Sequence, residues 1–150
     1  MSLGICLCGL ICYAQPGKQD NIRFSFTALR EKNSIIVNAS LHNTGADTVY
    51  FLSTSCDGLP YSLQFDTTKF TVYPRILCNA SWPIMLNIPP GGSLDFVAHF
   101  QSRKKEDEMK LGFDLYEVDK SFDLNQRELN IHFRNAAVRN TIWADVHRFD

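Results

Sequence analysis

The chain has almost no net charge, and it lacks long apolar stretches. Its 15 Lys and Arg residues stand against 16 Asp and Glu residues, which gives a formal charge of −1 over 150 residues. No broad electrostatic field therefore favours nucleic acid or anionic lipid. An apolar stretch of the about twenty residues that cross a bilayer is also missing. We therefore expect no nucleic-acid partner and no integral membrane segment.

Sequence motifs for metal and catalytic sites are missing as well. There is no CxxC, HxH or HExxH spacing and no GxSxG nucleophile motif. Asp114 and Glu117 could pair as carboxylates, but acidic residues on an outward strand face usually serve solubility. Residues 119–130 space oxygen ligands as a calcium loop does, yet Leu124 and Asn130 stand where an EF-hand needs Gly and Glu. We predict no catalytic residue, no metal site and no cofactor.

The histidines do not suggest a metal or catalytic site either. Each lies at a polar position of an alternating strand, where a solvent-facing side chain is the simplest interpretation. They are His42, His99, His132 and His147.

Residues 103–108 place three cationic side chains beside three anionic ones. Their fields cancel within about a Debye length, so a solvated hairpin loop is expected there.

The first fourteen residues differ from the rest of the chain. Leu3 to Ala14 carries no charge, and its roughly ten apolar residues suit the apolar region of a secretory signal. We predict a signal peptide over 1–14 and one domain over 15–150, secreted or periplasmic. No Lys or Arg precedes the apolar run, so a buried N-terminal strand is the alternative. Lipid anchoring at one of the cysteines before Ala14 ranks lower, because a bulky residue precedes each of them.

Export leaves two cysteines in the mature chain, Cys56 and Cys78. In an oxidising compartment an even pair is most simply one disulfide. It would close a loop of about twenty residues and stabilise the fold by roughly 3 kcal/mol on the chain-entropy model. Two free buried thiols are the alternative.

Most of the mature chain alternates apolar and polar residues with period two, or forms short β-branched and aromatic runs, as half-buried strands do. The predicted strands cover residues 22–28, 35–41, 48–53, 61–65, 70–73, 84–88, 94–100, 111–115, 129–133 and 142–146. Helical periodicity over ten or more residues is absent, and residues 119–128 could hold one helical turn. Many short strands separated by turn residues predict an all-β sandwich or barrel.

Two segments carry a family resemblance. Val37 to Gly45 followed by Thr48 to Phe51 resembles the second and third strands of bacterial immunoglobulin-like domains, and Leu86 to Phe96 resembles their proline–glycine turn into a long strand. The Cys56 and Cys78 pair is similar to that of small secreted immunoglobulin-like proteins. A fainter likeness is to the intracellular proteinase-inhibitor family with this sandwich. The resemblance implies an immunoglobulin-like antiparallel β-sandwich with one disulfide.

Aromatic residues gather around the expected disulfide loop. Leu59, Tyr61, Tyr73 and Trp82 lie in or just after the segment between the two cysteines, and such residues are typical anchors of a binding surface. The alternative, which the usual burial of aromatics favours, is that they pack over the disulfide as core.

These observations predict a non-enzymatic module that binds a protein or glycan outside the cytoplasm. The oligomeric state is left open. One alternative is a proteinase-inhibitor-like protein that inserts an exposed loop such as 56–60 into an enzyme cleft. Another is a hydrolase without a recognisable motif.

Overall fold

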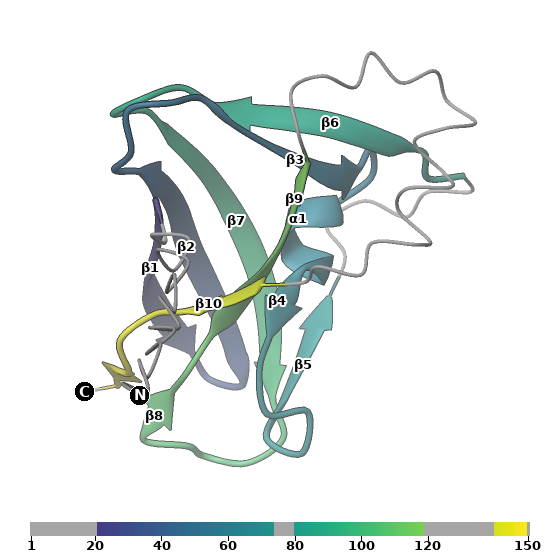
Figure 1. Cartoon of the computed structure of the whole chain (residues 1–150). Coiled ribbons are helices and arrows are strands. Elements are labelled where there is room, and N and C mark those ends of the chain that lie inside the picture. The colour runs from purple at the N-terminus through teal and green to yellow at the C-terminus, as the bar shows by residue number, and fades with distance from the viewer. Residues whose placement is uncertain (1–20, 74–79, 119–139, 150) are drawn as a thin grey trace, which may run out of the picture.

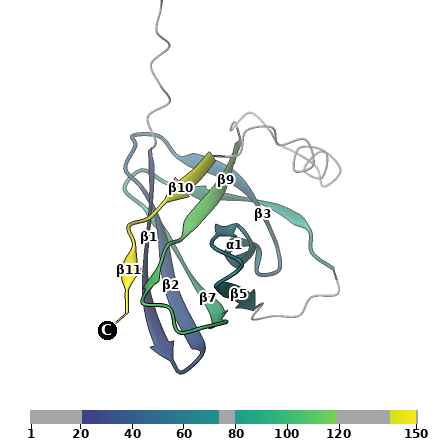
Figure 2. The ribbon, with the colours of Figure 1, turned by 90° about the horizontal axis from the view of Figure 1, so that it is seen from below.

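Two antiparallel sheets pack face to face in the computed structural model, which describes residues 21–73, 80–118 and 140–149 (Figures 1 and 2). In these residues the first sheet has the strand order β1-β2-β7-β5, and the second has the order β10-β9-β3-β6 with β4 also paired to β9. β11 and β8 form a separate two-stranded sheet. The prediction of an all-β antiparallel sandwich is confirmed.

The elements have the following bounds. The first sheet contains β1 (Ile22–Glu31), β2 (Ser34–Asn43), β5 (Phe70–Tyr73) and β7 (Ser93–Ser102). The second contains β3 (Val49–Thr54), β4 (Leu63–Gln64), β6 (Pro83–Ile88), β9 (Gly112–Val118) and β10 (Asn140–Trp143). The small pair is β8 (Glu108–Met109) with β11 (His147–Arg148), and one short helix, α1, spans Gly58–Tyr61.

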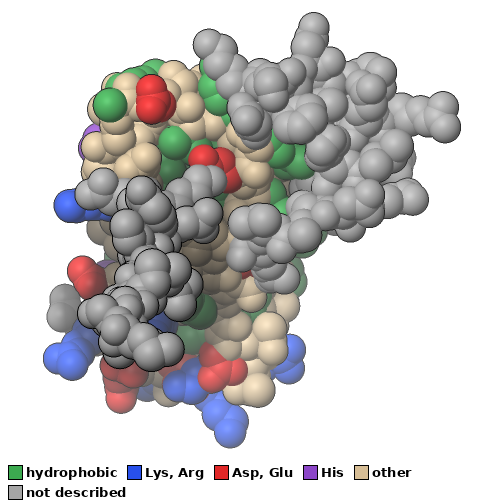
Figure 3. Space-filling view, viewed as in Figure 1, with side chains coloured by type: hydrophobic (Ala, Val, Ile, Leu, Met, Phe, Trp, Pro, Cys, Tyr) green, Lys and Arg blue, Asp and Glu red, His purple; other side chains and the backbone are tan. Residues whose placement is uncertain are grey.

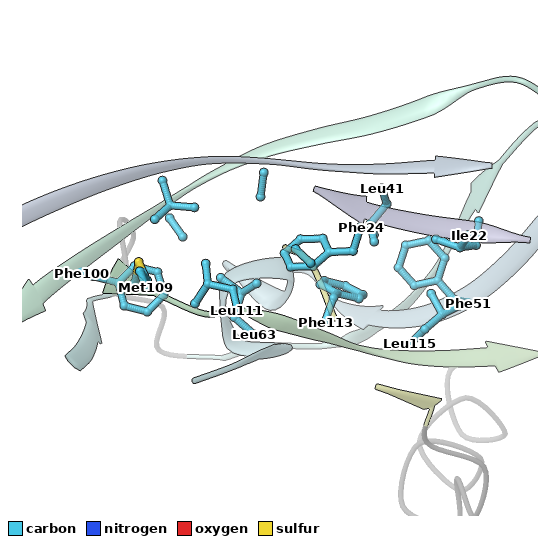
Figure 4. Close-up of a cluster of buried hydrophobic side chains, with 14 of the residues drawn as sticks. Ile22, Phe24, Leu41, Phe51, Leu63, Phe100, Met109, Leu111, Phe113 and Leu115 are labelled. Carbon is cyan, nitrogen blue, oxygen red and sulfur yellow. The ribbon is translucent and has the colours of Figure 1, made fainter. Parts of the chain in front are cut away.

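The alternation in the sequence puts one apolar face of each sheet into a shared core. Along β2, Ile35, Val37 and Leu41 are fully buried. Phe113 of β9 lies at the centre of the core, with its ring centroid 5.9 Å from that of Phe24. Aromatic rings at this separation add to the free energy gained by burying their area. Figure 4 shows several of these side chains between the strands.

Asn43, the last residue of β2, connects the two sheets at one end of the sandwich. Its Nδ2 donates to the carbonyl oxygens of Ile88 and Asp47, each at 2.8 Å, and its Oδ1 accepts from Gly45 N at 2.9 Å. Its backbone also pairs with the turn at 91–92, at 3.0 Å in both directions. Asn43 is fully buried, so this polar side chain links the first sheet to the second with its own hydrogen bonds satisfied.

Two expected strands differ from the structure. The strand predicted over 61–65 is replaced by the end of α1 and by the two residues of β4, because residues 58–61 form a helical turn that ends at Tyr61. The strand predicted over 142–146 breaks after Trp143, and the chain pairs again only at β11. Ala144 is buried at the break, and its N–H donates to Leu111 O at 3.1 Å.

Several predictions lie outside the described residues. They concern the signal segment 1–14, Cys78, the helical turn over 119–128, the strand over 129–133 and His132. In the part of the chain that the structure describes, no helix is long and apolar enough to span a bilayer.

Candidate functional site

Three of the four predicted ligand-surface residues are exposed. Tyr61, Tyr73 and Trp82 are 57%, 47% and 57% exposed, whereas Leu59 is half-buried and packs against the core. The interpretation in which all four pack as core is therefore wrong for the three aromatic residues. α1, the end of β5 and the segment just before β6 carry these residues. These parts of the chain lie on the side of the molecule away from β1 (Figures 1 and 2).

Two of the exposed aromatics are held to the scaffold, Trp82 through its backbone and Tyr73 through its hydroxyl group. The backbone of Trp82 is held by Ser55, whose N–H donates to Trp82 O at 2.8 Å and whose Oγ accepts from Trp82 N at 3.1 Å. The Tyr73 hydroxyl donates to Gln101 Oε1 on the neighbouring strand. The backbone of Trp82 and the ring of Tyr73 are therefore held in place, which lowers the entropy lost when a partner binds.

Cys56 lies beside the same segment. Its Sγ is 3.4 Å from the carbonyl oxygen of Ala80, two residues beyond Cys78. Cys56 therefore lies next to Ala80, which follows the predicted partner Cys78 by two positions in the sequence. Cys78 itself lies outside the described residues.

A hollow of about 550 Å³ lies next to α1, between the two sheets. Its apolar lining includes Leu86 from β6 and Leu94 and Phe96 from β7, and its polar lining includes Ser53 and Asp57. Volumes of this size are typical of small-molecule sites. Sequence reasoning did not find this hollow, because strand alternation indicates which side chains face inward but not whether they fill the space.

The start of α1 approaches β3 closely. A Cβ on Gly58 would lie 2.5 Å from Thr54 Oγ1 and 2.6 Å from Ser53 Oγ, which is closer than real Cβ contacts come. Asp57, at the N-terminal end of the helix, has the left-handed backbone angle φ 47°. Gly58 is therefore the residue that allows α1 to form one wall of the hollow.

The prediction that Asp114 lies on an outward face for solubility is wrong. Asp114 is only 2% exposed, and its two carboxylate oxygens accept hydrogen bonds from Gln64 Nε2 and Thr141 Oγ1, both at 2.6 Å. Glu117, the other carboxylate considered, is exposed. The alternation of the sequence indicates the face of β9 on which Asp114 lies. It does not show that side chains from the neighbouring strands β4 and β10 cover this face.

The described histidines are half-buried rather than fully solvated. His42 Nδ1 lies 2.9 Å from Ser93 Oγ. The His147 ring lies between those of Phe26 and Phe149, at centroid distances of 5.9 and 5.2 Å. Among the residues that the structure describes, no group of three or more His, Cys, Asp or Glu side chains could hold a metal ion.

Charged side chains of both signs gather at the end of the molecule away from α1, at the bottom of Figure 3. There Lys69 Nζ pairs with Glu106 Oε2 at 3.2 Å, and this partner raises the pKa of Lys69. Hydrogen bonds from the Thr68 hydroxyl and backbone N–H lower the pKa of Asp66. This mixture of signs agrees with a solvated loop over 103–107.

No model of a known protein family matches the chain, and no curated protein matches it. Among solved structures, it is similar to the FixG-related protein of Vibrio parahaemolyticus, at 10% identity over 86% of this chain and 96% of the other, with a TM-score of 0.39. The cupredoxin domain of amoB from Nitrosocaldus yellowstonii gives 11% identity over 81% and 61%, with a TM-score of 0.27. At these TM-scores, neither structure assigns a family or a function to this chain.

Proposed function

We propose that this chain is a non-enzymatic, extracytoplasmic binding module that recognises a protein or glycan. Its binding surface comprises Leu59, Tyr61, Tyr73 and Trp82, which we call the aromatic surface. The observation that carries the proposal is the exposure of the three aromatic rings on α1, at the end of β5 and just before β6. Tyr and Trp offer a large apolar area with a polar tip, and they are enriched among residues that dominate binding.

The same proposal includes the finer fold assignment, an immunoglobulin-like sandwich with a Cys56–Cys78 disulfide. The position of Cys56 Sγ, 3.4 Å from Ala80 O, supports it, since the chain needs only two more residues to reach Cys78. Secretion or periplasmic location belongs with this proposal, because the disulfide requires an oxidising compartment.

The proteinase-inhibitor-like alternative has less support. Residues 56–60 would have to present an extended backbone to an enzyme cleft. Instead Gly58 and Pro60 are buried, and the segment winds into α1 against β3. Within residues 21–73, 80–118 and 140–149, no specific observation favours that mechanism.

The test is binding of the mature chain to a glycan array and to a panel of purified secreted proteins. A Tyr61→Ser/Tyr73→Ser/Trp82→Ser variant is compared with a Leu29→Ser/Trp143→Ser/Val146→Ser control, whose three residues are 59%, 52% and 45% exposed. We expect the first variant to lose at least about tenfold in affinity and the control to bind as the wild type does. Equal binding by the two variants would contradict the proposal.

A further inference from the structure

The hollow beside α1 is a gap in the inter-sheet core. Ser53 is paired in register with Ile84, and Phe51 with Leu86, so these four side chains share the face of the second sheet that contains buried Phe51. A sandwich interior is normally filled by side chains interdigitating from both sheets. Here Leu86 and the β7 residues opposite remain only half-buried, and about 550 Å³ is left between them.

Ser53 stands where the alternation of β3 calls for an apolar residue. Val49 and Phe51, at the preceding positions of the same parity, are 7% and 1% exposed. Ser53 is itself only 2% exposed, and its Oγ has no hydrogen-bond partner. Leaving a buried hydroxyl without a partner is costly, and native proteins rarely do so without a reason. Ser53 also lines the hollow, so a molecule bound there could supply the missing partner.

The lining also limits the charge of that molecule. In the described residues it contains no Lys, Arg or His, and its one ionisable group is the Asp57 carboxylate. An anionic ligand would therefore enter a partly apolar site without a cation to pair with, which is unfavourable. Leu86, Leu94 and Phe96 supply apolar surface to the same hollow.

We propose that the hollow binds a small neutral molecule with an apolar body and one hydroxyl or carbonyl group. The apolar body packs against Leu86, Leu94 and Phe96, and the polar group makes a hydrogen bond with Ser53 Oγ. The volume is suited to such a ligand. This site is separate from the aromatic surface, apart from Leu59, which lines both, and it does not depend on recognition of a protein or glycan.

The experiment uses two pairs of neutral probes that differ in a hydroxyl group, benzyl alcohol with toluene and cyclohexanol with methylcyclohexane. Each is titrated into the ¹⁵N-labelled mature chain, and amide shifts give the site and the dissociation constant. We expect each alcohol to move the amides of Ser53, Leu86 and Phe96. Each alcohol should also bind more tightly than its hydrocarbon partner.

Ser53→Ala isolates the hydroxyl contact. In this variant we expect each alcohol to lose about threefold to tenfold in affinity while its hydrocarbon partner binds as before. Ser25→Ala is the matched control, because Ser25 is an exposed serine of β1, and it should leave all four affinities unchanged. Leu94→Trp should fill the hollow and abolish binding of all the probes.

Three results would overturn the proposal. They are an absence of shifts at the hollow with both pairs, an unchanged preference for the alcohols in Ser53→Ala, or binding that survives Leu94→Trp in a folded protein. If only an extended peptide added along the edge of β6 shifted these amides, the hollow would be part of a peptide groove, and the small-molecule proposal would fail. Because Ser53→Ala changes a single atom, its result stands even if Leu94→Trp does not fold.

Discussion

At the scale of single residues, Asp114 joins three strands of the second sheet through its side chain. Gln64 of β4 and Thr141 of β10 donate to separate oxygens of the carboxylate on β9. A buried carboxylate is tolerated when its oxygens are hydrogen-bonded, and removing it leaves its donors without acceptors. Asp114 therefore adds a side-chain link to the backbone pairing of β4 and β10 with β9.

We expect Asp114→Ala to lower the free energy of unfolding by about 2–3 kcal/mol, because two half-buried donors lose their acceptor. Urea denaturation measures the change. Asp95→Ala is the control, since Asp95 is an exposed carboxylate of β7, and it should change stability by less than about 0.5 kcal/mol. Equal stability of the two variants would show that the hydrogen bonds of Asp114 contribute little.

The exposed loop at Asp66 allows a test of electrostatics. The Thr68 hydroxyl is the largest of the causes that lower the pKa of Asp66 below its ordinary value of 3.8. We expect Thr68→Val to raise the pKa of Asp66, because the hydrogen bond to the charged carboxylate is lost. NMR titration of the Asp66 carboxyl group measures this directly.

The same shift has a defined effect on stability. A carboxyl group whose pKa is lower in the folded state contributes stability above its unfolded pKa, and this contribution is lost as the pH falls through the folded value. Thr68→Val should therefore lose stability at neutral pH and show a weaker pH dependence below about pH 4. A pKa of Asp66 that does not move in Thr68→Val would refute this assignment.

At the scale of elements, α1 is the feature that the alternation of the sequence obscured. Tyr61, Leu63 and Phe65 alternate with polar residues, and period two predicts a strand. The chain instead turns at Asp57, and Gly58 allows the helix to pack on β3. Contacts with the preceding strand therefore override the local pattern, and four residues are too few for helical periodicity to appear.

We expect Gly58→Ala to destabilise the protein by about 1–3 kcal/mol, because the added Cβ would lie 2.5 Å from Thr54 Oγ1. Thermal unfolding or urea denaturation measures the loss. The same substitution in a Ser53→Ala/Thr54→Ala background should cost less, since both nearby hydroxyl oxygens are gone. An equal cost in the two backgrounds would point to a backbone cause instead of a steric one.

The long strands were predictable because their apolar faces are continuous. β1, β2 and β7 each alternate over about ten residues, and the sheet that they form turns the predicted side toward the core. The candidate sites were less predictable. The position of Tyr73 and Trp82 around the expected disulfide loop suggested a binding surface, although the usual burial of aromatics favoured a place in the core. The burial of Asp114 and the unfilled space at Ser53 depend on how the strands pack.

At the scale of the whole molecule, the two ends of the sandwich differ. The end with the loops at Asp66 and 103–107 carries mixed charges, while the opposite part, near α1, carries the hollow and exposed aromatic rings. A binding function is therefore best sought near α1, away from the charged loops.

The proposed disulfide and export are tested together by the intact mass of the exported protein. We expect the chain to begin at Gln15 and to gain about 2 Da on reduction, the mass of two hydrogens. Reduction or Cys56→Ser should lower the free energy of unfolding by about 3 kcal/mol. A chain that keeps residues 1–14, or a mass unchanged by reduction, would remove the proposed compartment.

The hydrogen bonds around Asn43 also bear on how the protein ages chemically. Deamidation of an asparagine requires the next backbone nitrogen to attack the side-chain carbonyl carbon. Here the nitrogen of Thr44 donates to Asn21 O at 2.7 Å, and both ends of the Asn43 side chain are held. Cyclisation would have to break these bonds at a fully buried position. The junction between the two sheets is thus protected from the slow conversion to aspartate that exposed asparagines undergo.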